Sequence, residues 1–206
     1  MSFVLPKVYP ITDVKISRLS HAEQVERLAA GGATLIQLRE KTASPREFCD
    51  DAIEAMKIAR RLNVRIIIND RVDIAMAVDA DGVHVGQQDL PPDNARRLLG
   101  DSRIVGFSTH SVKQAVEADR APVDYIAIGP VFQTYTKENP HAVVGLEAIA
   151  EIRRQTSKPL VAIGGITLAR APSVLEAGAD SVAVISDLLS TGDISERIRE
   201  FIDRIR

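Results

Sequence analysis

Eight short apolar runs, separated by amphipathic segments, constrain the fold of this chain more than any other feature. Most of these runs are apolar throughout, which is typical of parallel strands that are buried on both faces. The segments between them place apolar residues at i, i+3 and i+4, which is the spacing of an amphipathic helix. We expect strands over residues 4–9, 35–38, 66–68, 82–85, 104–107, 125–128, 160–163 and 182–185.

Helix boundaries can also be read from the sequence. Ser44 stands before Pro45 and Glu47, which predicts an N-cap followed by a proline at the first helical position. The pair Gly31-Gly32 and Gly178 stand where helices should end. The clearest helical segments are residues 21–30, 45–62, 146–154 and 195–205.

Eight strands and about eight helices within 206 residues predict an α/β fold of the (β/α)₈ TIM-barrel type. The length suits a single compact domain over residues 1–206. The competing fold is an open, doubly wound sheet. That fold rarely needs eight parallel strands, and the G-x-G-x-x-G turn that usually marks it is absent from this sequence.

Charge and cysteine content bound the partners and the compartment. The net charge is −2 with acidic and basic residues interspersed, so neither nucleic acid nor a membrane is expected as a partner. Cys49 is the only cysteine and can form no internal disulfide. The first ten residues lack the apolar region of a signal peptide. We therefore expect a cytoplasmic protein, and the sequence leaves its oligomeric state open.

Two aspartates follow neighbouring expected strands and suggest a metal site. Asp70 comes directly after the run 66–68, and Asp89 follows the run 82–85. One helix separates these strands, so they should lie side by side and parallel, with both carboxylates at the same edge. Ligands bind at that edge in barrels. Two carboxylates without Cys or His pairs suit Mg²⁺ that also holds a phosphate.

Basic residues at the same expected edge point to a polyanion. Arg39, Lys41 and Lys137 are side chains of the types that commonly bind phosphate. Three cations and a metal exceed what one monophosphate requires, which favours a diphosphate. The alternative is that these three residues form structural salt bridges with acidic neighbours such as Glu40, Asp70 and Asp89.

A second phosphate site is expected after the last two strands. Gly164-Gly165 and Ser186 stand there, and barrels often bind phosphate at this place through backbone N–H groups. The alternative is that the two glycines only make a tight turn. Two phosphate sites, one of them for a metal-bound diphosphate, suggest a transferase with diphosphate as the leaving group.

The histidines and the cysteine are less informative. His84 lies inside an expected strand and is interpreted as a hydrogen-bonded core residue. His110 stands at the expected active rim, where it is either an acid–base group or structural. His21 and His141 are expected at the surface, and Cys49 is expected to pack on a long helix.

Several motif-like segments follow one another along nearly the whole chain. They are Y-P-I-T-D (9–13), Q-L-R-E-K (37–41), N-D-R-V-D (69–73), A-D-G-V-H-V-G-Q-Q-D (80–89), S-T-H-S (108–111), G-P-V-F (129–132), T-Y-T-K (134–137) and A-I-G-G-I (162–166). G-G-I is shared by many phosphate-binding barrels, whereas Q-L-R-x-K, N-D, G-Q-x-D and T-x-T-K are highly specific in this order. With these segments the chain resembles the thiamine phosphate synthase family.

The resemblance implies a (β/α)₈ barrel that joins 4-amino-5-hydroxymethyl-2-methylpyrimidine diphosphate to hydroxyethylthiazole phosphate. The products are thiamine phosphate and diphosphate. It also implies that Asp70 and Asp89 bind Mg²⁺. The catalytic residues that it implies are Arg39, Lys41, Ser108 and Lys137. The substrate-binding residues that we expect are Gln37, Leu38, Arg39, Glu40, Lys41, Asn69, Ser108, Thr134, Tyr135, Thr136, Lys137, Gly164, Gly165, Ile185 and Ser186.

Such a reaction agrees with the residue inventory. The aminopyrimidine can stabilise a CH₂ cation, so a dissociative path needs charge stabilisation on the departing diphosphate more than acid–base groups. Three other functions compete with it. A thiazole tautomerase of the same superfamily would need no metal, and His110 would be its acid–base group. A phosphosugar isomerase barrel would need a base near a carbonyl, and a non-catalytic metabolite-binding protein would have no use for a leaving-group site.

Overall fold

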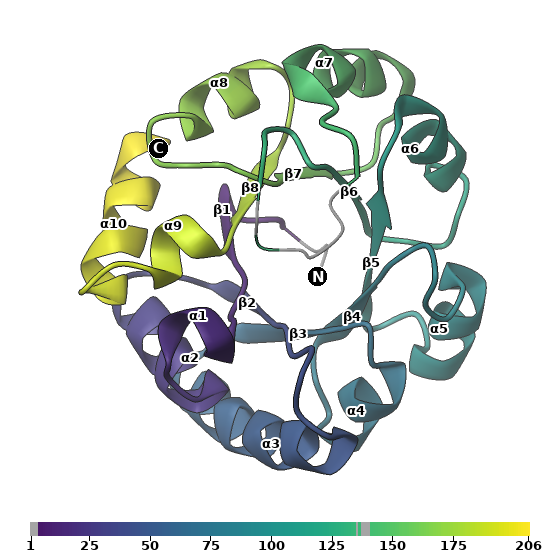
Figure 1. The fold of residues 1–206 in the computed structure, drawn as a ribbon. Helices are drawn as coiled ribbons and strands as arrows, with labels where there is room; N and C mark the ends of the chain where they lie inside the picture. The colour runs from purple at the N-terminus through teal and green to yellow at the C-terminus, as the bar shows by residue number, and fades with distance from the viewer. Residues whose placement is uncertain (1–3, 135, 137–140) are drawn as a thin grey trace.

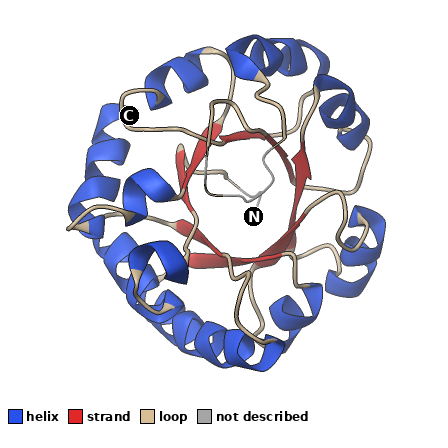
Figure 2. Ribbon diagram, in the orientation of Figure 1, coloured by secondary structure: helices blue, strands red, loops and turns tan. Residues whose placement is uncertain are grey.

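Eight parallel strands form one sheet that curls into a ring, and helices surround the ring (Figures 1 and 2). The structure is a computed structural model that describes residues 4–134, 136 and 141–206. From β2 onward each strand pairs with the next along the chain, and β1 pairs with β8. The strands are β1 (Val8–Pro10), β2 (Leu35–Leu38), β3 (Arg65–Asn69), β4 (Gly82–Val85), β5 (Ile104–Thr109), β6 (Tyr125–Ile128), β7 (Leu160–Ile163) and β8 (Ser181–Val184).

The gap between β1 and β2 is bridged just beyond the end of β1. Ile11 forms a parallel bridge with Gln37, and the Thr12 N–H donates to the Gln37 carbonyl at 2.8 Å. These contacts nearly close the barrel, which confirms the predicted (β/α)₈ fold over the open sheet.

Every strand is followed by at least one helix, and two helices follow both β1 and β8. Among the described residues, no helix has the combined length and apolar character needed to cross a membrane. The helices are α1 (Val14–Ser17), α2 (His21–Ala30), α3 (Pro45–Leu62), α4 (Val72–Ala77), α5 (Pro92–Leu99), α6 (Val112–Ala118), α7 (Gly145–Gln155), α8 (Ala171–Glu176), α9 (Ser186–Leu189) and α10 (Ile194–Arg204).

The long helix α3 begins and ends where the sequence predicts. The Ser44 hydroxyl accepts from the Glu47 N–H, and the Glu47 carboxylate accepts from the Ser44 N–H at 2.8 Å. This capping box satisfies two N–H groups that the first turn leaves unpaired. The helix ends at Asn63, which adopts the left-handed conformation with φ 55°.

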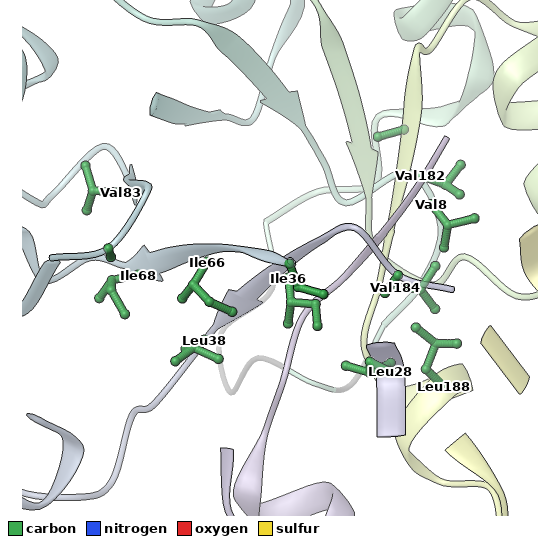
Figure 3. Close-up of a cluster of buried hydrophobic side chains, with 14 of the residues drawn as sticks. Val8, Leu28, Ile36, Leu38, Ile66, Ile68, Val83, Val182, Val184 and Leu188 are labelled. Carbon is green, nitrogen blue, oxygen red and sulfur yellow. The ribbon is translucent and has the colours of Figure 1, made fainter. Parts of the chain in front are cut away.

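Two layers of core arise because side chains alternate between the two faces of each strand. One layer lies between the sheet and the helices, and Figure 3 shows part of it, with Ile36 and Ile66 of the strands and Leu28 of α2 among its labelled side chains. The other layer fills the barrel. It contains Tyr9, Ile11, Leu35, Ile67, Ile104, Tyr125, Ala127, Val161 and Ala183.

The inward-facing positions become polar toward the carboxyl ends of the strands. Leu35 is followed two residues later by Gln37, and Ile67 by Asn69. On β5, Ile104 is followed on the same face by Gly106 and then Ser108. The apolar part of the barrel interior is therefore a floor, and polar side chains stand above it on the rim where ligands bind.

Two sequence predictions were wrong in detail. The first strand begins at Val8 and not at residue 4, because its partner β8 begins at Ser181 and leaves residues 4–6 with no strand to pair with. His21 is buried and not at the surface, since its ring packs at 5.4 Å from the Phe48 ring, between centroids.

Candidate active site

The loops at the carboxyl ends of the strands carry the polar residues that the sequence singles out. Those after β2, β3 and β4 hold acidic and basic side chains, including Arg39, Lys41, Asp70 and Asp89. The loops after β6, β7 and β8 hold hydroxyls and glycines. The two predicted anion sites therefore lie on one rim, in different halves of it.

A cavity opens at the β5–β8 half of the rim. Its walls come from the ends of four strands, and Ser108 lines it together with residues of the later loops. The predicted residues that line this cavity are Ser108, Thr134, Thr136, Gly164, Gly165, Ile185 and Ser186. The structure thus brings predicted substrate-binding residues from the loops after β6, β7 and β8 to the wall of one cavity.

The two glycines after β7 allow neighbouring loops to approach closely. Gly164 and Gly165 have positive φ angles of 104° and 63°, which favour glycine. A Cβ atom on Gly165 would lie 2.4 Å from the Gln133 carbonyl oxygen, and one on Gly164 would lie 2.6 Å from the Pro130 Cα. The Phe132 N–H donates to the Gly164 carbonyl at 3.0 Å. The glycines therefore do make a tight turn, and this turn packs the β7 loop directly against the loop that carries Thr134.

The segment after β2 distributes its side chains to three different places. Gln37 faces the barrel interior and is 3% exposed. The Leu38 side chain is fully buried among the residues between sheet and helices, so only its backbone can face a ligand. The Arg39 Nη1 atom lies 2.5 Å from the Asp13 Oδ2 atom, and Asp13 also caps α1 by accepting from the Ile16 N–H. Arg39 is thus held at the rim by a carboxylate that also caps a helix.

Asp70 and Asp89 come together as predicted. Asp70 adopts a left-handed conformation with φ 63° and pairs with the Lys41 ammonium. The Asp89 Oδ2 atom accepts from the Gly86 N–H at 2.7 Å. Burial raises the pKa of the Asp89 carboxyl, and the nearby Asp70 carboxylate adds to this effect, while the Gly86 N–H and Lys41 oppose it. The two carboxylates are therefore close enough to repel each other, with one ammonium as partial compensation.

Glu40 organises its own loop. One carboxylate oxygen, Oε1, accepts from the backbone N–H groups of Lys41, Thr42 and Ala43 at 2.7, 2.6 and 3.1 Å. The Thr42 hydroxyl donates to the same oxygen at 2.8 Å. Burial opposes ionisation of this group, but these donors outweigh it and lower its pKa to about 2. Glu40 therefore fixes the segment that presents Lys41, and among the described residues its other carboxylate oxygen lies 3.7 Å from the His21 Nε2 atom.

Replacing Glu40 by glutamine should destabilise the protein in a pH-dependent way. The folded-state pKa lies below the ordinary value of 4.5, so the stabilisation is complete above about pH 4.5 and is lost as the pH falls toward 2. We expect Glu40→Gln to lower the free energy of unfolding by about 2 kcal/mol at pH 7, because hydrogen bonds to a charged group are lost.

Urea unfolding of both proteins at pH 7, 5 and 3 measures this difference. It should shrink between pH 4.5 and 3, since the wild-type carboxyl becomes protonated. Glu54→Gln is the matched control, because Glu54 is exposed and pairs only with Lys57 on the same helix. A difference that stays constant with pH would contradict the role assigned to the Glu40 carboxylate.

Two of the predicted residues, Tyr135 and Lys137, lie outside the described residues. Their assignment to the site stays a prediction. The flanking hydroxyls of Thr134 and Thr136 lie 3.4 Å apart and both line the cavity. Asn69 is almost fully buried at the end of β3, on the inward face.

The histidines occupy more defined places than the sequence indicated. His84 is a hydrogen-bonded residue of the barrel interior, as predicted. The His110 Nδ1 atom lies 2.8 Å from the Gly129 carbonyl oxygen, and the His110 ring stacks on the His141 ring at 3.7 Å between centroids. His141 is exposed, as expected. Both rings border the cavity.

Sequence reasoning missed the residues that support the rim from below and behind. Asp13 pairs with Arg39, and Tyr9 and Tyr125 reach from the barrel floor toward His84. The tyrosines could have been found by counting alternate positions along each strand, because side chains on one face of a strand recur every second residue. The pairing of Asp13 leaves no such signal, since it joins residues 26 positions apart in different loops.

Comparison with known proteins agrees with this geometry. The family model described as "Thiamine monophosphate synthase" matches residues 8–188. A thiamine-phosphate synthase of Koribacter versatilis is 48% identical over 205 residues, covering 96% of this chain and 95% of its own. That of Chloroflexus aurantiacus is 45% identical over 195 residues, covering 94% and 90%.

A solved structure supports the same conclusion. The thiamine phosphate pyrophosphorylase from Pyrococcus furiosus superposes with a TM-score of 0.88 at 36% identity, covering 97% of this chain and 95% of its own. The family match spans most of the chain, and the curated relatives match almost end to end. This chain therefore belongs to the thiamine monophosphate synthase family.

Proposed function

We propose that this chain is a thiamine-phosphate synthase. It condenses 4-amino-5-hydroxymethyl-2-methylpyrimidine diphosphate with hydroxyethylthiazole phosphate and releases diphosphate. The observation that carries the proposal is the pairing of two different anion sites on one rim: a cavity with glycines and hydroxyls beside a cluster of carboxylates and cations. The names of the relatives support this function, and none of those reported is a thiazole tautomerase.

The cavity at the β5–β8 half would hold the thiazole phosphate. Thr134 and Thr136 supply hydroxyl donors, and the tight turn at Gly164 and Gly165 lets backbone N–H groups approach a phosphate. The short helix α9 begins at Ser186 on the same wall, which is the place where barrels of this kind often bind phosphate.

The β2–β4 half would hold the pyrimidine diphosphate. Gln37, Arg39, Lys41, Asn69, Ser108 and Lys137 are the residues that we assign to it. Arg39 and Lys41 are each paired with a carboxylate, so the diphosphate would compete with Asp13 and Asp70 for them. The salt bridges and the phosphate site are therefore compatible, because Arg39 and Lys41 can pair with the carboxylates when the site is empty and with the diphosphate when it is bound.

The chemistry of the Asp70 and Asp89 pair fits a magnesium ion. Two repelling carboxylates gain from a divalent cation between them, and Mg²⁺ typically takes one or two carboxylates together with water and substrate phosphates. No third metal-ligating side chain joins them among the described residues, which suits an ion completed by substrate. When bound, the ion would neutralise charge on the diphosphate.

The residues of the chain would then act mainly by positioning and by charge. The C–O bond to diphosphate breaks with its electron pair leaving on oxygen, and the thiazole nitrogen lone pair forms the new C–N bond. Arg39, Lys41 and Lys137 stabilise the negative charge that develops on the leaving group. Placement of the thiazole in the neighbouring cavity aligns its nitrogen with the methylene carbon. No proton has to be abstracted in this step.

Identification of the product tests this proposal. Incubation with both substrates should yield thiamine phosphate, detected by chromatography after oxidation to the fluorescent thiochrome derivative. Formation of a thiazole isomer from the thiazole phosphate alone, with no thiamine phosphate from the pair, would contradict the proposal and favour the tautomerase.

Replacing His110 by alanine should reduce synthase turnover by less than about tenfold, since no acid–base group is needed for the proposed step. General acid–base catalysis contributes roughly 100- to 10,000-fold, so a tautomerase that used His110 would lose most of its activity. Steady-state rates of the variant and the wild type decide between these outcomes. A matched His141→Ala variant reports the cost of losing the ring stack alone.

A further inference from the structure

A chain of hydrogen-bonded side chains crosses the barrel interior beneath the rim. The Gln37 Nε2 atom donates to the Tyr9 hydroxyl at 3.0 Å, and the Tyr9 and Tyr125 hydroxyls lie 3.1 Å apart. The Tyr125 hydroxyl lies 2.9 Å from the His84 Nδ1 atom, and the His84 Nε2 atom lies 2.7 Å from the Ser108 hydroxyl. This row of hydrogen bonds therefore joins two residues assigned to the pyrimidine diphosphate, Gln37 and Ser108, through Tyr9, Tyr125 and His84.

The middle residues of this row of hydrogen bonds are sealed from solvent. Tyr125 is fully buried, Tyr9 is 1% exposed and His84 is 6% exposed. Burying polar groups costs free energy unless they are hydrogen-bonded, and apolar side chains would fill the same space without that cost. Only Ser108, at one end, also borders the cavity. Because this row of hydrogen-bonded side chains ends at the cavity, it points to a role in the site.

The backbone of β5 makes room for this chain. Gly106 lies on the inward face between Ile104 and Ser108. A Cβ atom at Gly106 would lie 2.1 Å from the Tyr125 Cζ atom and 2.6 Å from the His84 Nδ1 atom. Any larger residue would therefore separate the tyrosine from the histidine.

The hydrogen bonds have a consistent direction. The amide nitrogen of Gln37 donates to the Tyr9 hydroxyl, and we assign the Tyr9 proton to the bond with Tyr125, which gives the hydrogen bonds one direction along the row. Burial raises the pKa values of both tyrosines above their ordinary value, so both keep their protons at neutral pH. With Tyr125 donating to the His84 Nδ1 atom, the histidine carries its proton on Nε2 and donates to Ser108. The Ser108 proton is then directed away from the histidine.

We propose that His84 is a positioning residue that holds the Ser108 hydroxyl as a hydrogen-bond donor toward the pyrimidine diphosphate. Tyr125 sets the histidine tautomer, and Tyr9 and Gln37 anchor the tyrosine. This inference rests on the proposed function, since it concerns how the same site orients its substrate.

The first test reads the histidine tautomer and does not depend on activity. Long-range ¹H–¹⁵N correlation spectra of protein with ¹⁵N-labelled histidine identify which ring nitrogen is protonated. The chain contains four histidines, and a His84→Asn spectrum assigns the His84 signals by their loss. We expect a neutral ring with its proton on Nε2 near pH 7. A proton on Nδ1 would overturn the proposal, and a Tyr125→Phe spectrum should show the preference for Nε2 weakened.

The second test compares two replacements of His84 that differ in reach. Glutamine can place an amide N–H near the position of Nε2, whereas asparagine is too short to reach Ser108. We expect His84→Asn to lower kcat/KM for the pyrimidine diphosphate by roughly ten- to a hundredfold, the loss of one hydrogen bond in a charged site, and His84→Gln to retain most of it. When Ser108→Ala is added to both variants, the ratio of kcat/KM for His84→Gln to that for His84→Asn should fall to about one. The serine hydroxyl that distinguishes the two replacements is then absent.

Ser181→Ala is the matched control for a polar group removed from the interior. The Ser181 hydroxyl is fully buried and has no hydrogen-bond partner among the described residues, so turnover should not change. Equal rates for the two His84 variants, or a difference that persists without Ser108, would overturn the proposal. Absence of thiamine phosphate formation by the wild-type protein overturns the proposed function instead. The ¹⁵N spectrum then still decides the direction of the hydrogen bonds by itself.

Discussion

Replacement of Asp89 by alanine should reduce turnover by about a hundredfold or more, because it removes half of the carboxylate pair that we assign to magnesium. The fold should remain intact, since Asp89 lies in a loop after β4 and its carboxylate accepts the Gly86 N–H of the same loop. Asp89→Asn is the sharper variant, because an amide oxygen can still accept from Gly86 while the charge is lost. Steady-state rates across a magnesium titration measure the effect.

The stability of these variants should move in the opposite direction from their activity. The Asp70 and Asp89 carboxylates repel each other in the absence of a cation, so Asp89→Asn should unfold at a temperature no lower than the wild type. Asp93→Asn is the control, since Asp93 is an exposed aspartate four residues away. Near-normal turnover of the Asp89 variants with magnesium would contradict the metal assignment.

Gly165→Ala should weaken binding of the thiazole phosphate at least tenfold and destabilise the fold by about 2 kcal/mol. The position has φ 63°, and the new Cβ atom would meet the Gln133 carbonyl oxygen at 2.4 Å and the Phe132 Cβ atom at 2.9 Å. The β6 and β7 loops would have to separate, and the cavity between them would change shape. Binding by isothermal titration calorimetry and urea unfolding measure the two effects.

Two other glycines separate backbone strain from steric contact. Gly100→Ala introduces a Cβ at φ 73° with no neighbouring atom within 4 Å, so it reports the strain alone. Gly192→Ala has neither a positive φ nor a neighbour within 4 Å, and should behave as the wild type. If Gly165→Ala lost no more affinity than Gly100→Ala, the close packing of the two loops would not matter for the phosphate site.

The sequence predicted the fold well because the signals for it are local. Continuous apolar runs mark strands buried on both faces, and the capping box at Ser44 and Glu47 marks the start of α3. The first strand was predicted too long, because the apolar character of Val4 and Leu5 does not reveal where the partner strand begins. The residue at which a strand begins depends on its partner strand, so the sequence of one segment does not determine it.

The sequence predicted which residues lie at the candidate site, but not which contacts they form with one another. Topology alone places Asp70 and Asp89 at one edge, and the structure brings them within range of each other. That Glu40 binds its own loop, and that Arg39 pairs with Asp13, depends on side-chain geometry that residue types do not encode. The burial of His21 was missed for the same reason.

The proposed synthase reaction requires two substrates, and a coupled diphosphate-release assay measures this requirement directly. The assay is run with both substrates, with each one omitted in turn, and with and without Mg²⁺. We predict release of one diphosphate per thiamine phosphate formed, only when both substrates and the metal are present. Absence of release from the complete mixture, together with tight binding of the thiazole phosphate alone, would contradict the account.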